Sequence, residues 1–337
     1  MKRGLKRGGI AALVVASLVL LAAGCGGKFD KPLELSRTVK LGEYSYIPAY
    51  RGFENSTSLS ISLGSLYVSF HDPLSEPPAG TVITYFSDAD PVPENLVKPF
   101  NGLERPYVVG AGKRQIAVAD SEDVQVVKIY GLAGGDAILT FTDPAWDRIT
   151  GLAVDDTGNV YVADATKNFV RSYKPSGRPR FEVDLADSGF GIGHVLSPMG
   201  LAIDNETLLI AEASTEKAQV QRVRIDRPQT GIPFSADVPF INVYTDAEGN
   251  QMTLSAPIGV AAGSEGSVFI LDKGLGKIFR FDSQGNSIAI VNSEEQTGPT
   301  DVGDAISIDT YNPPSQTSAS IYILDPVRGV IHRWDPK

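Results

Sequence analysis

Short apolar runs separated by polar turns recur along most of the chain, and they indicate β-strands rather than helices. The segment 148–182 shows the pattern most clearly. Leu152–Val154 ends at a polar turn, and the β-prone run Val160–Ala163 follows it. Phe169–Tyr173 is a third run, which ends at the break Lys174–Gly177. The segment therefore predicts an antiparallel meander of three strands and the start of a fourth, which is the content of one propeller blade.

The same meander recurs six times along the chain. Its most regular part is an apolar strand that ends in an acid, except in the first copy. These strands are Leu66–Phe70, Ile116–Asp120, Val160–Asp164, Leu208–Glu212, Val268–Asp272 and Ile321–Asp325. The copies are 44 to 60 residues apart, the upper range for a blade with its loops. A strand of small residues precedes each copy, which suits packing near a crowded axis, and a strand that alternates apolar and polar residues follows.

The last copy stops short of a full blade. The chain ends at Lys337, directly after the third strand, so one sheet edge would stay open. We predict that the segment before the first blade, around 37–41 or 44–47, adds as the missing strand and closes the ring. The alternative is a seventh, degenerate blade from residues 28–55. The predicted fold is all-β: a six-bladed β-propeller of four-stranded antiparallel blades over residues 37–337, with the last blade closed by an N-terminal strand.

Four features of the third copy match a known repeat. They are Gly151–Asp155, Gly158–Asp164, Asn168 and Arg171, and together they resemble the NHL repeat. This resemblance implies a β-propeller. It specifies the architecture well and the activity poorly.

The N-terminus reads as a targeting segment. Residues 2–7 carry four cations, and Ile10–Leu21 is an apolar stretch too short to span a bilayer. The following Leu21–Cys25, with the sequence LAAGC, resembles a bacterial lipobox. The resemblance implies a signal peptide over residues 1–24, acylation of Cys25, and a tether over residues 25–36 to a membrane outside the cytoplasm. Gly26 suggests the outer membrane, if the cell has one. The alternative is ordinary secretion with an incidental cysteine.

The charge of the chain narrows the set of partners. The net charge is −10, and without the predicted signal 26 Lys and Arg face 40 Asp and Glu, which gives −14. Such a surface repels nucleic acid and anionic headgroups, so no nucleic-acid partner is expected. Cys25 is the only cysteine, so no disulfide forms within the chain and stability must come from packing.

The acids at the strand ends are the most regular polar feature. We expect them to accept backbone N–H bonds within the turn that follows. A divalent cation needs several oxygens that converge on one point, whereas equivalent positions of six blades lie far apart. Five further acids are expected to be solvated turn carboxylates: Asp155, Asp156, Asp301, Asp304 and Asp309. No cofactor is predicted, and calcium is the one metal ion that these acids leave open.

One face of the predicted ring should carry the binding site. It holds the connections into the inner strands and the turns between second and third strands. The candidate binding residues on it are Arg105, Tyr107, Trp146, Arg148, Phe190, His194, Met199 and Met252, with Phe53 beside them. Recognition surfaces favour such aromatic, basic and flexible groups. The alternative for Trp146 and Phe190 is that they only pack loops onto blades.

Two functions remain open. The first is a membrane-anchored module that binds a protein, peptide or glycan through this face, because the regular features serve the fold and none serves a reaction. No serine elbow, HExxH or CxxC pattern occurs, and three histidines leave little for acid–base chemistry. The second is a metal-dependent propeller enzyme of lactonase or lyase type, whose metal ligands would come from strand ends such as Asp204, Asn205 or Asp309.

Overall fold

The computed structural model describes residues 44–72, 74, 79–87, 97–121, 124–230, 240–246, 248–293, 298–313 and 318–337. All of them belong to one compact unit, residues 39–337. Within these residues no helix is long and apolar enough to cross a membrane. The predicted signal peptide, Cys25 and the tether lie outside the described residues, so the lipid anchor stays a prediction.

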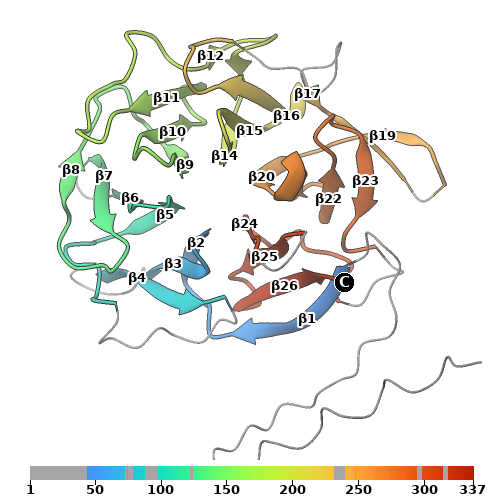
Figure 1. Cartoon of the computed structure of the whole chain (residues 1–337), viewed down its shortest axis with the longest axis horizontal. Coiled ribbons are helices and arrows are strands. Elements are labelled where there is room, and N and C mark those ends of the chain that lie inside the picture. The colour runs from blue at the N-terminus through green and yellow to red at the C-terminus, as the bar shows by residue number, and fades with distance from the viewer. Residues whose placement is uncertain are drawn as a thin grey trace, which may run out of the picture. The chain divides into compact units, whose positions relative to one another are not determined.

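Six antiparallel sheets surround a central axis, each as one blade of a β-propeller (Figure 1). The first blade holds β2 (Ser56–Ser62), β3 (Ser65–Asp72) and β4 (Ala79–Phe86), and the second holds β5 (Pro106–Ala111), β6 (Gln115–Ser121), β7 (Gln125–Gly131) and β8 (Leu139–Phe141). The third holds β9 (Ile149–Val154), β10 (Val160–Asp164) and β11 (Phe169–Tyr173), and the fourth holds β14 (Pro198–Asp204), β15 (Thr207–Ser214), β16 (Lys217–Arg224) and β17 (Phe240–Ile241). The fifth holds β20 (Pro257–Ala262), β21 (Val268–Asp272), β22 (Lys277–Phe281) and β23 (Ser287–Ile290), and the sixth holds β24 (Ser307–Tyr311), β25 (Ser320–Asp325), β26 (Val330–Pro336) and β1 (Tyr44–Arg51). The predicted all-β, six-bladed architecture is confirmed.

Each blade begins with its inner strand, next to the axis, so the ring has two distinct faces. We call the side where the inner strands begin the entry face; it is defined by Ser56, Pro106, Ile149, Pro198, Pro257 and Ser307. The side where they end is the exit face; it is defined by Ser62, Ala111, Val154, Asp204, Ala262 and Tyr311. Because neighbouring strands are antiparallel, the turns between second and third strands also lie on the entry face.

The N-terminal strand closes the ring, as predicted. β1 pairs antiparallel with β26, with Tyr44 opposite Pro336 and Arg51 opposite Val330. The two strands lie side by side in Figure 1. β1 thus covers the edge that β26 would otherwise expose, and this pairing excludes the alternative of a seventh blade. Of the two predicted segments it is 44–47 that pairs, and 37–41 lies outside the described residues.

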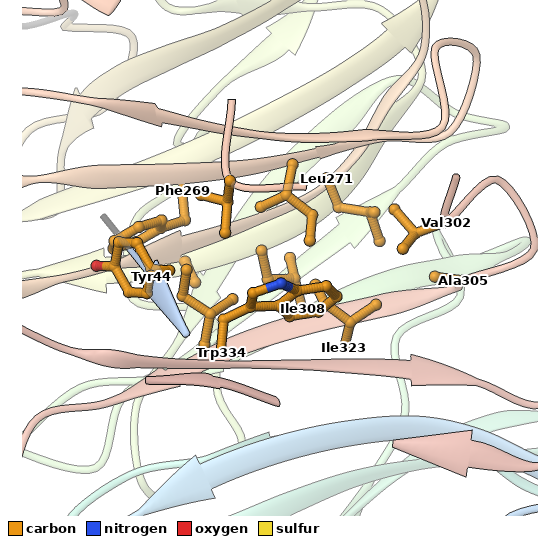
Figure 2. Packing of buried hydrophobic residues seen from close by; sticks show 12 residues of the cluster. Tyr44, Phe269, Leu271, Val302, Ala305, Ile308, Ile323 and Trp334 are labelled. Atoms are coloured by element: carbon orange, nitrogen blue, oxygen red, sulfur yellow. The ribbon is translucent and has the colours of Figure 1, made fainter. Parts of the chain in front are cut away.

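The closing strand also contributes to the core between the fifth and sixth blades. Figure 2 shows Tyr44 beside Phe269 of β21, with Trp334 of β26 nearby. The rings of Tyr44 and Phe269 meet edge to face, with 5.9 Å between their centroids. Tyr44 is 1% exposed and Trp334 is 0% exposed. Burying an aromatic side chain of this size stabilises a fold by roughly 1.5–3 kcal/mol, so β1 is part of the core as well as of the edge.

The outer edges are less regular than the inner strands. In the third blade the predicted outer strand 181–183 does not form. Two isolated bridges, Val170 with Ala186 and Tyr173 with Pro179, hold the chain there instead. Two small sheets connect the third, fourth and fifth blades: β12 (Asp187–Ser188) with β13 (His194–Val195), and β18 (Val243–Thr245) with β19 (Gln251–Thr253). The predicted outer strand 96–97 falls partly outside the described residues.

One turn sequence recurs in three strand connections. It reads Asp-x-x-Gly-Asn at 155–159, 246–250 and 282–286, and the glycine has φ of +87°, +85° and +83° respectively. In each copy one carboxylate oxygen accepts the backbone N–H groups two and four residues later, and the other accepts the Asn side-chain amide. The positive φ favours glycine, because a Cβ would be strained there. The motif therefore builds a tight strand connection from local bonds alone.

Candidate functional site: the entry face and the central channel

The strand-end acids are buried beneath the entry face, and they accept hydrogen bonds from its backbone. Asp120, Asp164, Glu212, Asp272 and Asp325 are all 0% exposed. Asp164 accepts the backbone N–H groups of Asp147 and Arg148, which lead into β9, and those of Thr166 and Lys167 in the turn after β10. The predicted bond to the following turn is confirmed for Asp164. The bond to the incoming connection was not predicted.

The same arrangement recurs in the second and fifth blades. Asp120 accepts the backbone N–H groups of Glu104 and Arg105, at 3.0 and 2.6 Å. Lys128 also forms a buried ion pair with Asp120, at 2.9 Å. Asp272 accepts the N–H groups of Ser255 and Ala256. In these three blades the acids thus bind the backbone that enters the inner strand, and in two of them that backbone carries Arg105 and Arg148.

Arg105 and Arg148 lead into the inner strands of the second and third blades on the entry face, and Tyr107, two residues after Arg105, lines the channel. Both arginines are exposed, and neither forms an ion pair with a described residue. Tyr107 is half-buried, and its hydroxyl donates a hydrogen bond to Gln125. Burial raises the pKa of Tyr107, the nearby Asp120 and Asp164 raise it further, and Arg148 opposes them. Two predicted basic residues and one predicted aromatic residue therefore lie on the entry side of two neighbouring blades.

Trp146 does not belong to this surface. It is 8% exposed and lies in the hydrophobic core, where its ring contacts those of Phe141 and Tyr173 at centroid distances of 5.7 and 5.4 Å. The alternative considered for it, packing of a loop onto the blade, therefore describes its position. Phe53 is also buried, against Phe70 and Tyr85.

The other predicted residues are spread over the ring. Phe190 and Met252 are 63% and 45% exposed, and lie in the connections into the fourth and fifth blades. His194 binds Asp187 through Nδ1, and the Gln229 side-chain amide donates to the same carboxylate at 2.6 Å. His194 is thus held in a hydrogen-bonded loop, and the structure does not bring it to Arg105 or Arg148. Met199 lies at the channel wall.

The central channel is the large hollow of the molecule, with a volume of about 1190 Å3. It is lined by the inner strands, and at the exit face its wall extends to turn residues such as Lys113, Asp156, Glu206 and Glu265. Of the predicted binding residues only Tyr107 and Met199 line it. The residues at the exit-face mouth of the channel were therefore not among those predicted from the sequence.

Asp309 is the carboxylate inside this channel. It is half-buried on β24, and its Oδ2 accepts bonds from the Ser60 hydroxyl at 3.0 Å and the Ile61 N–H at 2.7 Å. Its Oδ1 accepts the N–H of Thr310 at 2.7 Å. Burial raises its pKa to about 6, although these bonds oppose the rise. The prediction of a solvated turn carboxylate was wrong for Asp309.

A signal for Asp309 was present in the sequence. The strand registers align it with small residues of the other blades, namely Ser60, Gly110, Ala153, Ala202 and Ala261. An acid at a position where the other blades have a small residue indicates a role particular to that blade. The comparison requires the blades to be aligned by their hydrogen-bond register, which can be predicted only approximately from residue pattern.

Asp155 corrects another expectation. It is 5% exposed rather than solvated, and it accepts bonds from Thr157, Asn159 and Tyr161. Burial by itself would raise its pKa, but these bonds together hold the pKa below its ordinary value. Asp156 is exposed as expected, and it pairs with Lys113 at 2.6 Å. Asp301 and Asp304 are exposed as well.

The described residues contain no group of three or more His, Cys, Asp or Glu side chains that could hold a metal ion. Asp309 has hydroxyl and N–H donors as neighbours rather than further carboxylates. The arrangement offers the channel the hydrogen-bonded carboxylate of Asp309 on an inner strand and further carboxylates at its exit end, and offers the entry face two exposed guanidinium groups.

No protein-family model and no curated protein matches this chain. Several solved structures are similar in fold. A structural genomics protein of unknown function from Bacteroides thetaiotaomicron has a TM-score of 0.58 and 13% identity, over 87% of this chain and 72% of that one. A catalytically inactive virginiamycin B lyase from Staphylococcus aureus, with quinupristin, has a TM-score of 0.51 and 11% identity, over 87% and 99%. A streptogramin B lyase has a TM-score of 0.51 and 10% identity, over 88% and 97%. At these identities the likeness shows the propeller fold alone.

Proposed function

We propose that the protein is a lipid-anchored, extracytoplasmic propeller of NHL type that binds a protein, peptide or glycan through its entry face. The repeat Gly151–Asp155 and Gly158–Asp164 supports the NHL assignment, and the LAAGC sequence ending at Cys25 supports the anchor. In this proposal the membrane is a partner of the protein through the acyl chains on Cys25. At about 0.8 kcal/mol per buried methylene, two or three acyl chains hold a protein on a bilayer nearly permanently.

The observation that carries the binding role is the presence of two exposed arginines on the entry face of neighbouring blades, Arg105 and Arg148. Arg105 and Arg148 have no ion-pair partner among the described residues, on a chain with a net charge of −10. Two guanidinium groups beside Tyr107 are suited to bind an acidic group of a ligand through paired hydrogen bonds. Exposed Phe190 and Met252 add apolar contact area on the same side of the ring.

A second candidate is a propeller enzyme of lyase or lactonase type. The observation that favours it is Asp309, a carboxylate with a raised pKa inside the channel. Two of the solved structures with this fold are a virginiamycin B lyase and a streptogramin B lyase. Metal analysis of the purified protein separates the candidates. A stoichiometric calcium or zinc ion that survives dialysis favours the enzyme, and its absence favours the binding module.

Crosslinking in the native cell tests the binding role. The neighbours of the wild-type protein are compared with those of Arg105→Ala/Arg148→Ala. The matched control is Arg114→Ala/Lys174→Ala, which removes two exposed cations from the exit side. We expect the first variant to lose neighbours that the control keeps. Equal neighbours in both variants would remove the entry face as the binding site. Trp146 is left intact, because its substitution would open a cavity in the core.

A Cys25→Ser variant tests the anchor. We expect the wild type in the membrane fraction and the variant in the soluble extracytoplasmic fraction. Mass spectrometry of the wild-type N-terminus should show an acylated cysteine. Recovery of both proteins in the soluble fraction would contradict the anchor and leave ordinary secretion.

A further inference from the structure

The channel has two chemically different walls. Where the sixth blade meets the first, the wall carries Ser60, Ser62, Ser307 and Asp309. Across the ring, where the third blade meets the fourth, the wall carries Val154, Leu201 and Ile203. Leu201 and Ile203 stay partly exposed to the channel. The cavity is therefore polar on one side and aliphatic on the other, which suits a ligand that is itself amphipathic.

The polar wall carries a negative charge without a cation against it. Every hydrogen bond to Asp309 comes from a neutral donor: the Ser60 hydroxyl and the N–H groups of Ile61 and Thr310. No described Lys or Arg forms an ion pair with it. A carboxylate withdrawn from water is costly unless its charge is compensated. A cation that enters the channel would supply that compensation.

The exit-face mouth of the channel also favours a positively charged ligand. Asp204, Glu206 and Glu265 line it. Asp204 has Arg222 at 3.9 Å, whereas Glu206 and Glu265 form no ion pair with a described residue, and Lys113, the cation of the lining, is paired with Asp156 at 2.6 Å. Carboxylates around an opening raise the local concentration of cations and speed their entry. A metal ion would need several oxygen ligands at one point, and the described residues form no such group. An organic cation needs only one carboxylate and an apolar surface for its body.

We propose that the channel binds a small organic cation, a primary amine on an aliphatic body. It enters from the exit face, places its ammonium group on Asp309, and lays its carbon chain against Leu201 and Ile203. The cavity of about 1190 Å3 has room for such a molecule together with water. This site is separate from the arginines of the entry face, so it goes beyond the binding role proposed above and does not rest on it.

Isothermal titration calorimetry with hexylamine tests the site, with 1-hexanol as the uncharged analogue of the same length. We expect the wild type to bind hexylamine and not hexanol. Asp309→Asn keeps the size and the acceptor oxygen but removes the charge, and should weaken hexylamine binding tenfold or more. Asp156→Asn, an exposed carboxylate at the mouth, should change it less than threefold.

Ile203→Ala provides a second variant in case Asp309→Asn does not fold, which circular dichroism would show. Because it shortens the aliphatic wall, it should weaken hexylamine binding about threefold to tenfold. The proposal is overturned if the wild type binds hexylamine no better than hexanol, or if the Asp309→Asn variant binds it as tightly as the wild type. Calcium binding at Asp309 with no amine binding would also overturn it.

Discussion

The carboxylate of Asp309 accepts a hydrogen bond from the hydroxyl of Ser60 at 3.0 Å, across the seam where the last blade meets the first. The Ser60 oxygen in turn accepts the N–H of Ala111 on the second blade, at 3.0 Å. One chain of bonds thus crosses three inner strands. Equivalent positions in the other blades are occupied by glycine or alanine, so this link is particular to the seam.

Asp309 should make stability depend on pH in a direction opposite to that of most acids. Its pKa is raised from 3.8 to about 6, so between pH 4 and pH 6 the folded chain holds a proton that the unfolded chain has released. The contribution of this group to the free energy of unfolding is therefore greatest at low pH and is lost as the pH rises through about 6. The full effect is at most about 3 kcal/mol, from 1.36 kcal/mol per pKa unit.

Urea unfolding of the wild type and Asp309→Asn at pH 4.5 and pH 7.5 measures this effect. We expect the variant to gain about 1–3 kcal/mol relative to the wild type between the lower and the higher pH. Comparing the two proteins cancels the titration of the other acids. A difference that is the same at both pH values would show that Asp309 titrates normally.

Asp155 should show the reverse dependence. Its hydrogen bonds hold its pKa below the ordinary value, so its contribution to stability is present above about pH 4 and is lost as the pH falls further. Asp155→Asn should cost about 1–3 kcal/mol at pH 6, because bonds to a buried carboxylate are lost or weakened. The deficit should narrow at pH 3, as thermal unfolding at the two pH values would reveal. A deficit that grew toward pH 3 would refute the assignment.

Asp164→Ala should destabilise the protein strongly. Its carboxylate accepts four backbone N–H groups, and its removal leaves them without that acceptor. We expect a loss of about 3–5 kcal/mol in the free energy of unfolding, measured in urea at pH 7. Asp156→Ala is the control, since Asp156 and Lys113 are 66% and 63% exposed and their pair should contribute less than about 1 kcal/mol. Equal losses would indicate that the strand-end acid has no special role.

Removal of β1 should open the ring. We compare a chain that begins at residue 44 with one that begins at residue 53, which lacks the partner of β26. The shorter chain should lose its cooperative urea transition or form oligomers through the exposed edge of β26. Trp334, whose ring lies 5.3 Å from that of Tyr46, reports on the change by fluorescence, and light scattering measures the mass. A monomeric, cooperative shorter chain would mean that the blade is stable with its edge open.

The sequence was informative about the fold because blade structure is largely local. The strands that end in Asp120, Asp164 and Asp272 were found from residue pattern alone, and the closing strand followed from the missing fourth strand at Lys337. The site was less predictable, because burial depends on distant segments. Trp146 lies in the core only because Phe141 and Tyr173 meet over it. Asp309 faces the channel because the strand registers place it there, and not in a turn.

The pairing of β1 with β26 joins the first described strand of the chain to the last. During synthesis Tyr44–Arg51 emerges first and its partner Val330–Pro336 last, so the first strand must wait for nearly the whole propeller before it can be used. An incomplete copy, stalled or cut anywhere before the final strand, keeps a free sheet edge at one end and an unclaimed apolar strand at the other. Completion of the ring covers both strands at once, so we expect a shortened copy to be cut by proteases and to associate more readily than the full chain.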